Sequence, residues 1–209
     1  MAVPAPIRLH YELAGQSKGL NFSADALLDW RHDSRTYQAR MEISAFLVGS
    51  RSQTSSGRIS SQGLQPERFS DHSRRERITL FDHAAGLIRH EPGGGTLEMP
   101  AATQDRLSVF IQLALQMAGL EHEPKAGDSW TILVAATRAI EHWTFRWRGT
   151  EDLALPNGRI VAWHLQREAT KAGETRVDIW LAPELGFMPA RLRLQQDNGD
   201  SIDQRLLRH

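Results

Sequence analysis

Hydrophobic and polar residues alternate along most of this chain, which is the pattern of a β-strand with one buried face. The segments 7–13, 20–30 and 37–47 follow this rule, and short polar turns separate them. Consecutive strands joined by short turns pair in antiparallel fashion. The first quarter of the chain is therefore predicted to form a meander of three long strands.

The segment 51–61 departs from the alternation because Ser, Thr, Gln and Arg occupy both sets of positions and only Ile59 is apolar. It is predicted to be a solvated or edge strand. The other segments with strand character are 67–73, 75–82, 87–90, 96–99, 130–136, 139–148, 161–165, 177–181, 188–194 and 202–207. Roughly ten strands are expected in all.

One stretch has a helical pattern instead. Between Thr103 and Gly119, apolar residues recur at three- and four-residue steps, and other apolar residues fill the remaining sides. Thr103 is the predicted N-cap and Gly119 the predicted end. A helix that is apolar nearly all round, yet interrupted by Asp105 and Arg106, suits a protein interior better than a bilayer.

Together these patterns predict a mainly β (α+β) protein. We expect a strongly curved antiparallel sheet or half-barrel around the single helix at 103–119, because this arrangement buries both the alternating strand faces and the apolar helix. With 209 residues the chain supports one sizeable core. Residues 7–209 are therefore predicted to be one domain, and the Pro/Ala-rich residues 1–6 a linker remnant.

Composition narrows the classes of function. The 25 Lys and Arg balance the 25 Asp and Glu, so no global field draws the chain to nucleic acid. The absence of Cys removes disulfides, thiolate nucleophiles and the usual structural zinc sites. The start lacks the apolar core of a signal peptide, and a signal or anchor that precedes this segment is one interpretation of its Pro/Ala residues.

The candidate ligand-binding face is apolar. Aromatic residues of the strands and apolar residues of the helix are expected to converge on the concave side of the sheet, where they either hold an acyl chain or simply fill the core. The members of this candidate face are Phe22, Trp30, Leu107, Phe110, Ile111, Met117, Trp143, Phe145, Trp147 and Trp163.

Other chemistry is weakly supported. The nine His residues show no metal-binding spacing, and His142 and His164 fall on polar strand faces, so surface histidines and no metal or cofactor are expected. No GxSxG motif or phosphate-binding loop occurs, so no catalytic residues are assigned. The basic run 73–77 and the alternating Arg191 and Arg193 are read as solvated strand faces, although either could meet a lipid phosphate, a glycan or an acidic partner.

Two polar residues at the start of the helix have a structural interpretation. Gln104 and Asp105 open a segment that is otherwise buried, and buried polar groups require hydrogen-bond partners. We expect them to tie the start of the helix to a strand.

The order of several motifs resembles a family of Gram-negative envelope proteins known as a domain of unknown function, DUF3108. The matching stretches are YELAG at 11–15, SSGRISSQGLQPERF at 55–69, LFDHAAG at 80–86, TQDRLSVFIQL at 103–113 and WLAPELGFMPARLRLQQDNGD at 180–200. The resemblance implies a periplasmic protein, with an anchor outside this segment. It also implies a fold similar to that of the LolA and LolB lipoprotein carriers, which hold acyl chains on a concave apolar face.

Three hypotheses of function follow. The first is a non-enzymatic periplasmic module that binds or carries a lipid or another amphiphile. The second is an envelope scaffold with a closed core that binds another protein. The third is an unrecognised envelope hydrolase, which would require polar groups with shifted pKa values in a cleft. No nucleic acid partner is expected, and the oligomeric state stays open.

Overall fold

The structure is a computed structural model that describes residues 3–45, 49–169 and 171–208. Within these residues, one antiparallel sheet contains 14 strands. The strands are β1 (Ile7–Ser17), β2 (Leu20–His32), β3 (Thr36–Ala45), β4 (Gly49–Ser60), β5 (Gly63–His72), β6 (Glu76–Asp82), β7 (Leu87–Glu91), β8 (Thr96–Glu98), β9 (Ser129–Ala135), β10 (Ile140–Leu155), β11 (Gly158–Arg167), β12 (Arg176–Ala182), β13 (Met188–Gln195) and β14 (Ser201–Arg208). An α-helix, α1 (Ser108–Ala118), and a short 3-10 helix, η1 (Pro183–Leu185), complete the fold.

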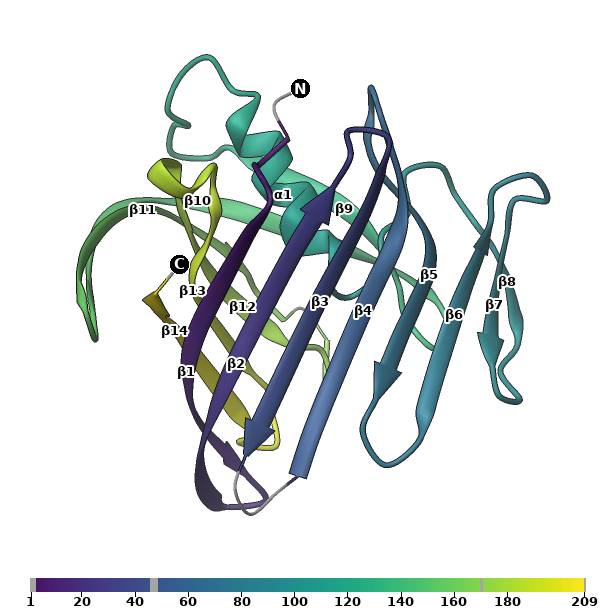
Figure 1. Cartoon of the computed structure of the whole chain (residues 1–209), viewed down its shortest axis with the longest axis horizontal. Coiled ribbons are helices and arrows are strands. Elements are labelled where there is room, and N and C mark those ends of the chain that lie inside the picture. The colour runs from purple at the N-terminus through teal and green to yellow at the C-terminus, as the bar shows by residue number, and fades with distance from the viewer. Residues whose placement is uncertain (1–2, 46–48, 170, 209) are drawn as a thin grey trace.

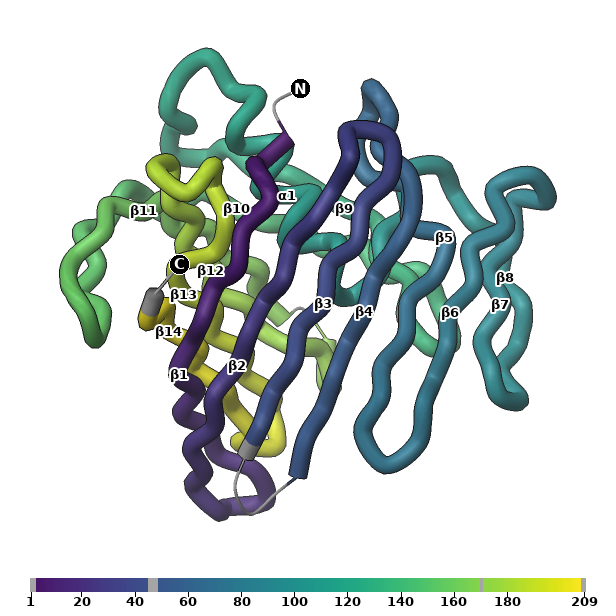
Figure 2. The backbone as a smooth tube through the Cα atoms, in the orientation of Figure 1, coloured from purple at the N-terminus to yellow at the C-terminus, as the bar shows by residue number. Residues whose placement is uncertain are grey.

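The sheet is open, with β8 and β9 at its two edges and the order β8-β7-β6-β5-β4-β3-β2-β1-β14-β13-β12-β11-β10-β9. Every neighbouring pair except β1 with β14 is a hairpin of consecutive strands. The β1–β14 pairing therefore joins two meanders into one sheet. The sheet curls so that α1 lies behind β1 to β4 and in front of the strands of the second meander (Figure 1). The same path is clear in the backbone trace (Figure 2).

The predicted curved antiparallel sheet around one helix is confirmed, but the expected count of roughly ten strands is wrong. The fourteen strands correspond to the three segments of the first meander, to 51–61 and to the ten further segments with strand character, including 87–90 and 96–99, which form β7 and β8. The error therefore lies in the total and not in the segments. The predicted extension of the third strand to Leu47 lies outside the described residues.

Strand β4 is not an edge strand, which corrects one of the two alternatives predicted for 51–61, a solvated or an edge strand. It pairs with β3 on one side and with β5 on the other. Its inward positions carry small residues, Ser55 and Gly57, and both are buried. A Cβ at Gly57 would lie 2.1 Å from the Gln65 carbonyl oxygen, so this close approach requires glycine. A strand with small and polar residues can thus lie in the interior of the sheet, because the strands on both sides pair with it closely.

The helix is shorter than predicted and begins at Ser108 rather than near Thr103. The Thr103 hydroxyl donates to the Pro100 carbonyl, so Thr103 is not the N-cap. Gln104 instead pairs with β9, because its N–H lies 2.7 Å from the Leu133 oxygen and its own oxygen accepts from Ala135 at 2.8 Å. At the other end, the Gly119 N–H donates to the Leu115 carbonyl, as expected for the last turn.

Two apolar clusters lie on opposite sides of α1. Leu107, Ile111 and Leu115 pack into the first, which is lined mainly by the N-terminal meander. Val109, Leu113 and Met117 pack into the second, which is lined by β9 to β13. The all-round apolar character of the helix is explained by these two contacts.

Residues before β1 also contact the core. The Pro4 carbonyl oxygen accepts from Trp30 Nε1 at 2.9 Å and lies 3.0 Å from His32 Nε2. In the part of the chain that the structure describes, no helix has both the length and the apolar character to cross a bilayer.

Candidate functional site

The predicted apolar face is divided between the two clusters, because α1 stands between them. Four of its residues, Phe22, Trp30, Leu107 and Ile111, belong to the first cluster. The other six, Phe110, Met117, Trp143, Phe145, Trp147 and Trp163, belong to the second. The prediction therefore assigned residues of two separate clusters to a single face. Periodicity shows which side of a strand is buried but not which element covers it.

The space around the helix is packed. Ile111, Met117 and Phe145 have at most 1 % of their surface exposed. Two hollows formed by described residues lie away from α1, because no residue of the helix lines either of them. The larger of them, about 520 Å³, is an open depression between the ends of β1 and β2 beside Gly15 and Phe22. Apolar side chains such as Ile111, Met117 and Phe145 thus fill the space beside the helix.

Half-buried aromatic side chains remain accessible at one end of the second cluster. We call Trp147, Trp163, Phe187 and Val161 the aromatic strip. Trp163 makes edge-to-face contacts with both other rings, at 5.3 Å to Trp147 and 4.8 Å to Phe187. Val161 lies two residues before Trp163 on β11 and thus on the same face, and it is 52 % exposed.

Phe187 reaches the strip through an unusual backbone conformation. Its φ of 64° lies in the left-handed region, which bulky residues rarely adopt. The preceding Gly186 also has a positive φ, and the Phe187 N–H donates to the Ala182 carbonyl at 2.8 Å. Backbone strain of this kind persists where surrounding contacts impose it, and it often accompanies functional surfaces.

The loop between α1 and β9 borders the aromatic strip. Thr150, the cross-strand partner of Trp163, donates its hydroxyl to Glu123 of that loop at 2.6 Å. The Trp147 N–H donates to the Asp128 carbonyl at 3.0 Å. Leu120, which opens the loop, is exposed. The apolar surface of the aromatic strip is thus bordered by the polar side chains of Glu123 and Thr150.

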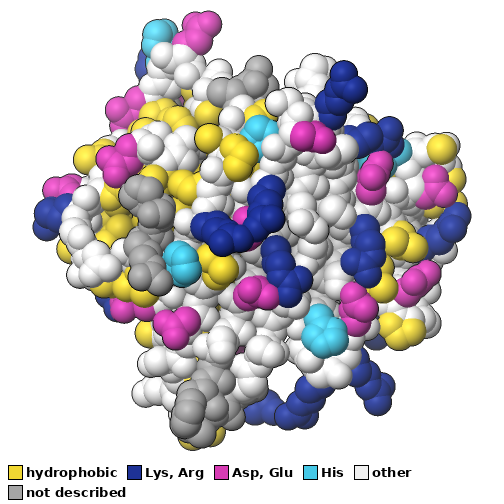
Figure 3. Space-filling view, in the orientation of Figure 1, with side chains coloured by type: hydrophobic (Ala, Val, Ile, Leu, Met, Phe, Trp, Pro, Cys, Tyr) yellow, Lys and Arg dark blue, Asp and Glu magenta, His cyan; other side chains and the backbone are white. Residues whose placement is uncertain are grey.

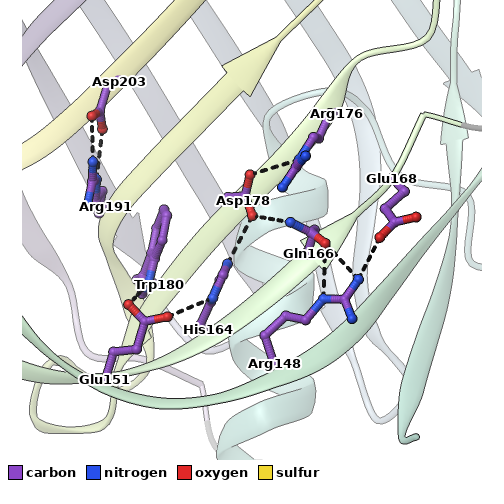
Figure 4. A network of polar contacts seen from close by, with 10 residues as sticks. All are labelled: Arg148, Glu151, His164, Gln166, Glu168, Arg176, Asp178, Trp180, Arg191 and Asp203. Carbon is purple, nitrogen blue, oxygen red and sulfur yellow. Dashed lines mark hydrogen bonds and ion pairs between the residues drawn. The ribbon is translucent and has the colours of Figure 1, made fainter.

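A polar network covers the opposite, outer face of the same strands, and the helix lies behind it in Figure 4. His164 is at its centre, with Nδ1 2.8 Å from Glu151 Oε1 and Nε2 3.0 Å from Asp178 Oδ1. Its ring stacks on Trp180 at 4.4 Å, and Trp180 Nε1 donates to Glu151. The Arg191 guanidinium lies over the Trp180 ring.

The network extends sideways through side chains that share acceptors. Gln166 donates to Asp178 at 2.6 Å and accepts from Arg148, which also donates to Glu168. Arg176 also pairs with Asp178. Figure 4 shows these partners together with the Arg191–Asp203 pair.

His164 is not a surface histidine, which corrects the sequence-based expectation for this residue. Its side chain is only 13 % exposed. The end of the β10–β11 hairpin lies close to β14, where Asn157 donates to the Leu207 carbonyl at 2.9 Å. This hairpin brings Glu151 over Trp180, so a polar strand face becomes covered. His142 is exposed, as predicted.

Asp178 is held in its charged form. Burial by itself would raise its pKa, but hydrogen bonds from His164 and Gln166 and the charge of Arg176 outweigh burial, so the pKa of the carboxyl lies below its usual value. Among the described residues, no three acidic or histidine side chains converge as metal ligands. The contacts of the network join β10, β11 and β12 across the sheet.

Replacing Asp178 with asparagine is expected to lower the free energy of unfolding at pH 7 by about 1–3 kcal/mol, because hydrogen bonds to a charged group are lost. A carboxyl with a depressed folded pKa contributes stability above its unfolded pKa of 3.8 and loses it as pH falls through the folded value. Urea unfolding at pH 7 and pH 3 measures this, and the deficit of the variant should shrink at pH 3. The exposed Asp25→Asn is the control, and an equal deficit there would contradict the prediction.

A second polar group lies at the start of α1 and is wholly buried. Asp105 Oδ1 accepts from the N–H groups of Leu107 and Ser108 at 2.8 and 2.7 Å. Its Oδ2 accepts from the Ser55 hydroxyl of β4 at 2.5 Å, and Ser55 in turn contacts the Tyr37 hydroxyl. The predicted tie between the helix start and a strand is confirmed, and Gln104 adds a bond from Nε2 to the Leu64 carbonyl.

Comparison with known proteins places the chain in a family. The model of DUF3108, described as a protein of unknown function, matches residues 8–206. The chain belongs to the DUF3108 family. No curated protein matches its sequence.

The DUF3108 chain is similar in structure to a beta-barrel-like protein of domain of unknown function DUF1849 from Brucella abortus. That crystal structure matches with a TM-score of 0.65 and 11 % sequence identity over 99 % of this chain and 98 % of the other. At this identity the likeness shows the fold alone. The expected likeness to the LolA and LolB carriers and the envelope location stay predictions.

Sequence reasoning missed Phe187 and the three-residue centre of the polar network, Glu151, His164 and Asp178. Phe187 follows a Gly in the segment PELGF, which signals a turn but not the direction of the ring. The network joins three strands, and its contacts depend on a hairpin position that no local pattern encodes.

Proposed function

We propose that this DUF3108 protein is a non-enzymatic binding module of the periplasm that holds a lipid or another amphiphile against the aromatic strip. The observation that supports this most directly is the continuous set of half-buried rings, Trp147, Trp163 and Phe187, beside the exposed Val161. Soluble proteins seldom leave such side chains together at the surface without a partner.

The form of the strip suits an elongated apolar group. The packed interior leaves no room around Ile111 and Met117, so the bound group would lie along the sheet rather than inside it. Edge-to-face rings offer flat apolar contact, and each methylene removed from water contributes about 0.8 kcal/mol. The polar border at Glu123 and Thr150 would face a head group.

Displacement of a fluorescent fatty-acid probe tests the proposal. Trp163→Ala removes the ring at the centre of the strip, and we expect the probe dissociation constant to rise about tenfold, which corresponds to about 1.4 kcal/mol. Native mass spectrometry of the protein purified from membranes gives an independent test through co-purifying lipid.

Phe22→Ala is the matched control, because Phe22 is also a half-buried aromatic residue but belongs to the first cluster. Its variant should bind the probe like the original protein. If no lipid co-purifies and the probe is not displaced, or if both variants weaken probe binding equally, the proposal is wrong.

An envelope scaffold that binds another protein is the second candidate. The observation in its favour is the dense packing on both sides of α1, where residues of the first and second clusters are almost fully buried. On this alternative the aromatic strip contacts a protein, and crosslinking from an exposed position such as Val161 would capture it while the probe fails to bind.

The expectation that the protein is not an enzyme stays a prediction. Among the described carboxyls with shifted pKa values, the two that are buried are Asp178, in the polar network, and Asp105, at the start of α1. Neither lines one of the two described hollows.

A further inference from the structure

The turn between β5 and β6 carries the densest group of cations in the chain. Arg74 and Arg75 are exposed on this turn, and Arg77 is exposed at the start of β6. Figure 3 shows dark blue side chains projecting at the lower edge of the molecule, where this turn lies in Figure 1. We call residues 73–77 the arginine turn.

The acids next to the arginine turn are already engaged by other groups. Glu76 accepts from Arg68 and from the Ser70 hydroxyl, and its pKa is lowered by these hydrogen bonds. Asp71 accepts from Arg51 and Gln53. Among the described residues, Arg74, Arg75 and Arg77 therefore have no ion-pair partner.

Other basic groups on the sheet differ in this respect. Arg191 and Arg193, the alternating arginines of β13, both contact Asp203. Arg8 and Arg31 likewise share Asp29. The charges of these arginines are largely compensated by the carboxylates. Three adjacent cations without an ion-pair partner among the described residues favour a surface of opposite charge.

The same rim of the sheet also exposes an apolar residue. In an antiparallel meander, alternate turns lie at one edge, so the β1–β2 and β5–β6 turns share the lower rim seen in Figure 1. Leu20 follows the β1–β2 turn and is 75 % exposed. β2 and β5 are three strand spacings apart, which is about 15 Å.

We propose that this rim docks on a membrane surface that carries anionic phospholipid head groups. Arg74, Arg75 and Arg77 meet the phosphates, and Leu20 enters the interfacial region. Cations combined with an exposed apolar side chain fit a lipid interface better than a nucleic acid, which offers no apolar layer beside its phosphates. The proposal is independent of whether the aromatic strip holds an amphiphile.

Vesicle flotation at low salt tests it, with vesicles of phosphatidylglycerol mixed into phosphatidylcholine and vesicles of phosphatidylcholine alone. We expect binding only to the anionic vesicles, and screening by salt should weaken it. The triple variant R74Q/R75Q/R77Q should lower the partition coefficient about 100-fold, because each basic residue near an anionic surface contributes about a factor of five. Leu20→Ser should lower it about tenfold.

The control variant R35Q/R138Q/R146Q has the same net charge as the triple variant of the arginine turn. Its three arginines are exposed, lie away from this rim and have no ion-pair partner among the described residues. This control should bind anionic vesicles within about twofold of the original protein, since distant charges are screened. Thermal unfolding confirms that each variant is folded.

Three results would overturn the proposal. One is no binding to anionic vesicles at low salt. Another is an equal loss in both triple variants, which would show a net-charge effect alone. The third is retention on immobilised polyglutamate without vesicle binding, which would assign the arginine turn to an acidic protein. Probe displacement on the aromatic strip is unaffected by any of these outcomes.

Discussion

Replacing Asp105 with alanine is expected to lower the free energy of unfolding by about 3–5 kcal/mol, among the largest single effects in this protein. The variant leaves the N–H groups of Leu107 and Ser108 and the Ser55 hydroxyl without their acceptor. All three are buried, so each unsatisfied group costs about 1–3 kcal/mol before relaxation. Urea unfolding followed by circular dichroism measures the change.

Asp105→Asn separates hydrogen bonding from charge. Its amide oxygen can accept from the two N–H groups, and its amide nitrogen can donate to Ser55, so the loss at neutral pH should stay below about 1 kcal/mol. Burial raises the pKa of the Asp105 carboxyl despite its hydrogen bonds. A group with a raised folded pKa contributes stability below its unfolded pKa and loses it as pH rises through the folded value.

The stability of Asp105→Asn relative to the original protein should therefore improve as pH rises above the usual range of an aspartate. Asp128→Ala is a suitable control, because Asp128 accepts from the Lys125 N–H in an exposed turn, and less than about 1 kcal/mol should be lost. A loss below about 1 kcal/mol in Asp105→Ala would show that the tie between α1 and β4 contributes little.

Phe145→Ala is expected to cost about 3–5 kcal/mol, whereas Trp163→Ala should cost about 1–2 kcal/mol despite its larger ring. The reason is burial, since Phe145 is a member of the second cluster with 0 % of its surface exposed, while Trp163 is only partly buried. Urea unfolding midpoints and slopes of both variants provide the measurement.

This contrast decides which predicted ligand residues belong to the core. A variant that loses much stability but, when folded, binds the probe normally identifies a core residue. A variant that keeps most of its stability but binds the probe more weakly identifies a binding residue. Phe145→Leu, which retains most of the apolar volume, should lose less than about 1.5 kcal/mol. Equal losses for Phe145→Ala and Trp163→Ala would place the aromatic strip in the core and would favour the scaffold alternative.

Much of the local structure was predictable from residue patterns. The alternation in 20–30 placed Ala24, Ala26 and Leu28 on the buried face, and all three are buried. The polar Gln104 and Asp105 at the start of an apolar helix correctly indicated contact with strands. Both predictions rest on short-range periodicity or on the rule that buried polar groups require partners.

The candidate site was only partly predictable. Six of the ten predicted face residues meet in one cluster, because each lies on the inward side of its strand or on α1. Their exposure depends on what packs against them, and Trp147 and Phe145, two residues apart on β10, differ in burial. The ring of Phe187 and the covered position of His164 arise from a strained turn and a bent hairpin.

The strand faces, the apolar character of the helix and the need to satisfy Asp105 were predictable from the amino-acid sequence, because they follow from side-chain chemistry at fixed spacing. The separation of two clusters by α1 and the interior place of the polar β4 arise only in the folded chain, as does the lack of ion-pair partners for the arginine turn among the described residues. These properties depend on contacts between distant segments, such as Ser55 with Asp105 and Glu76 with Arg68. Pairing of β1 with β14 joins the two halves and creates the enclosed space in which those contacts form.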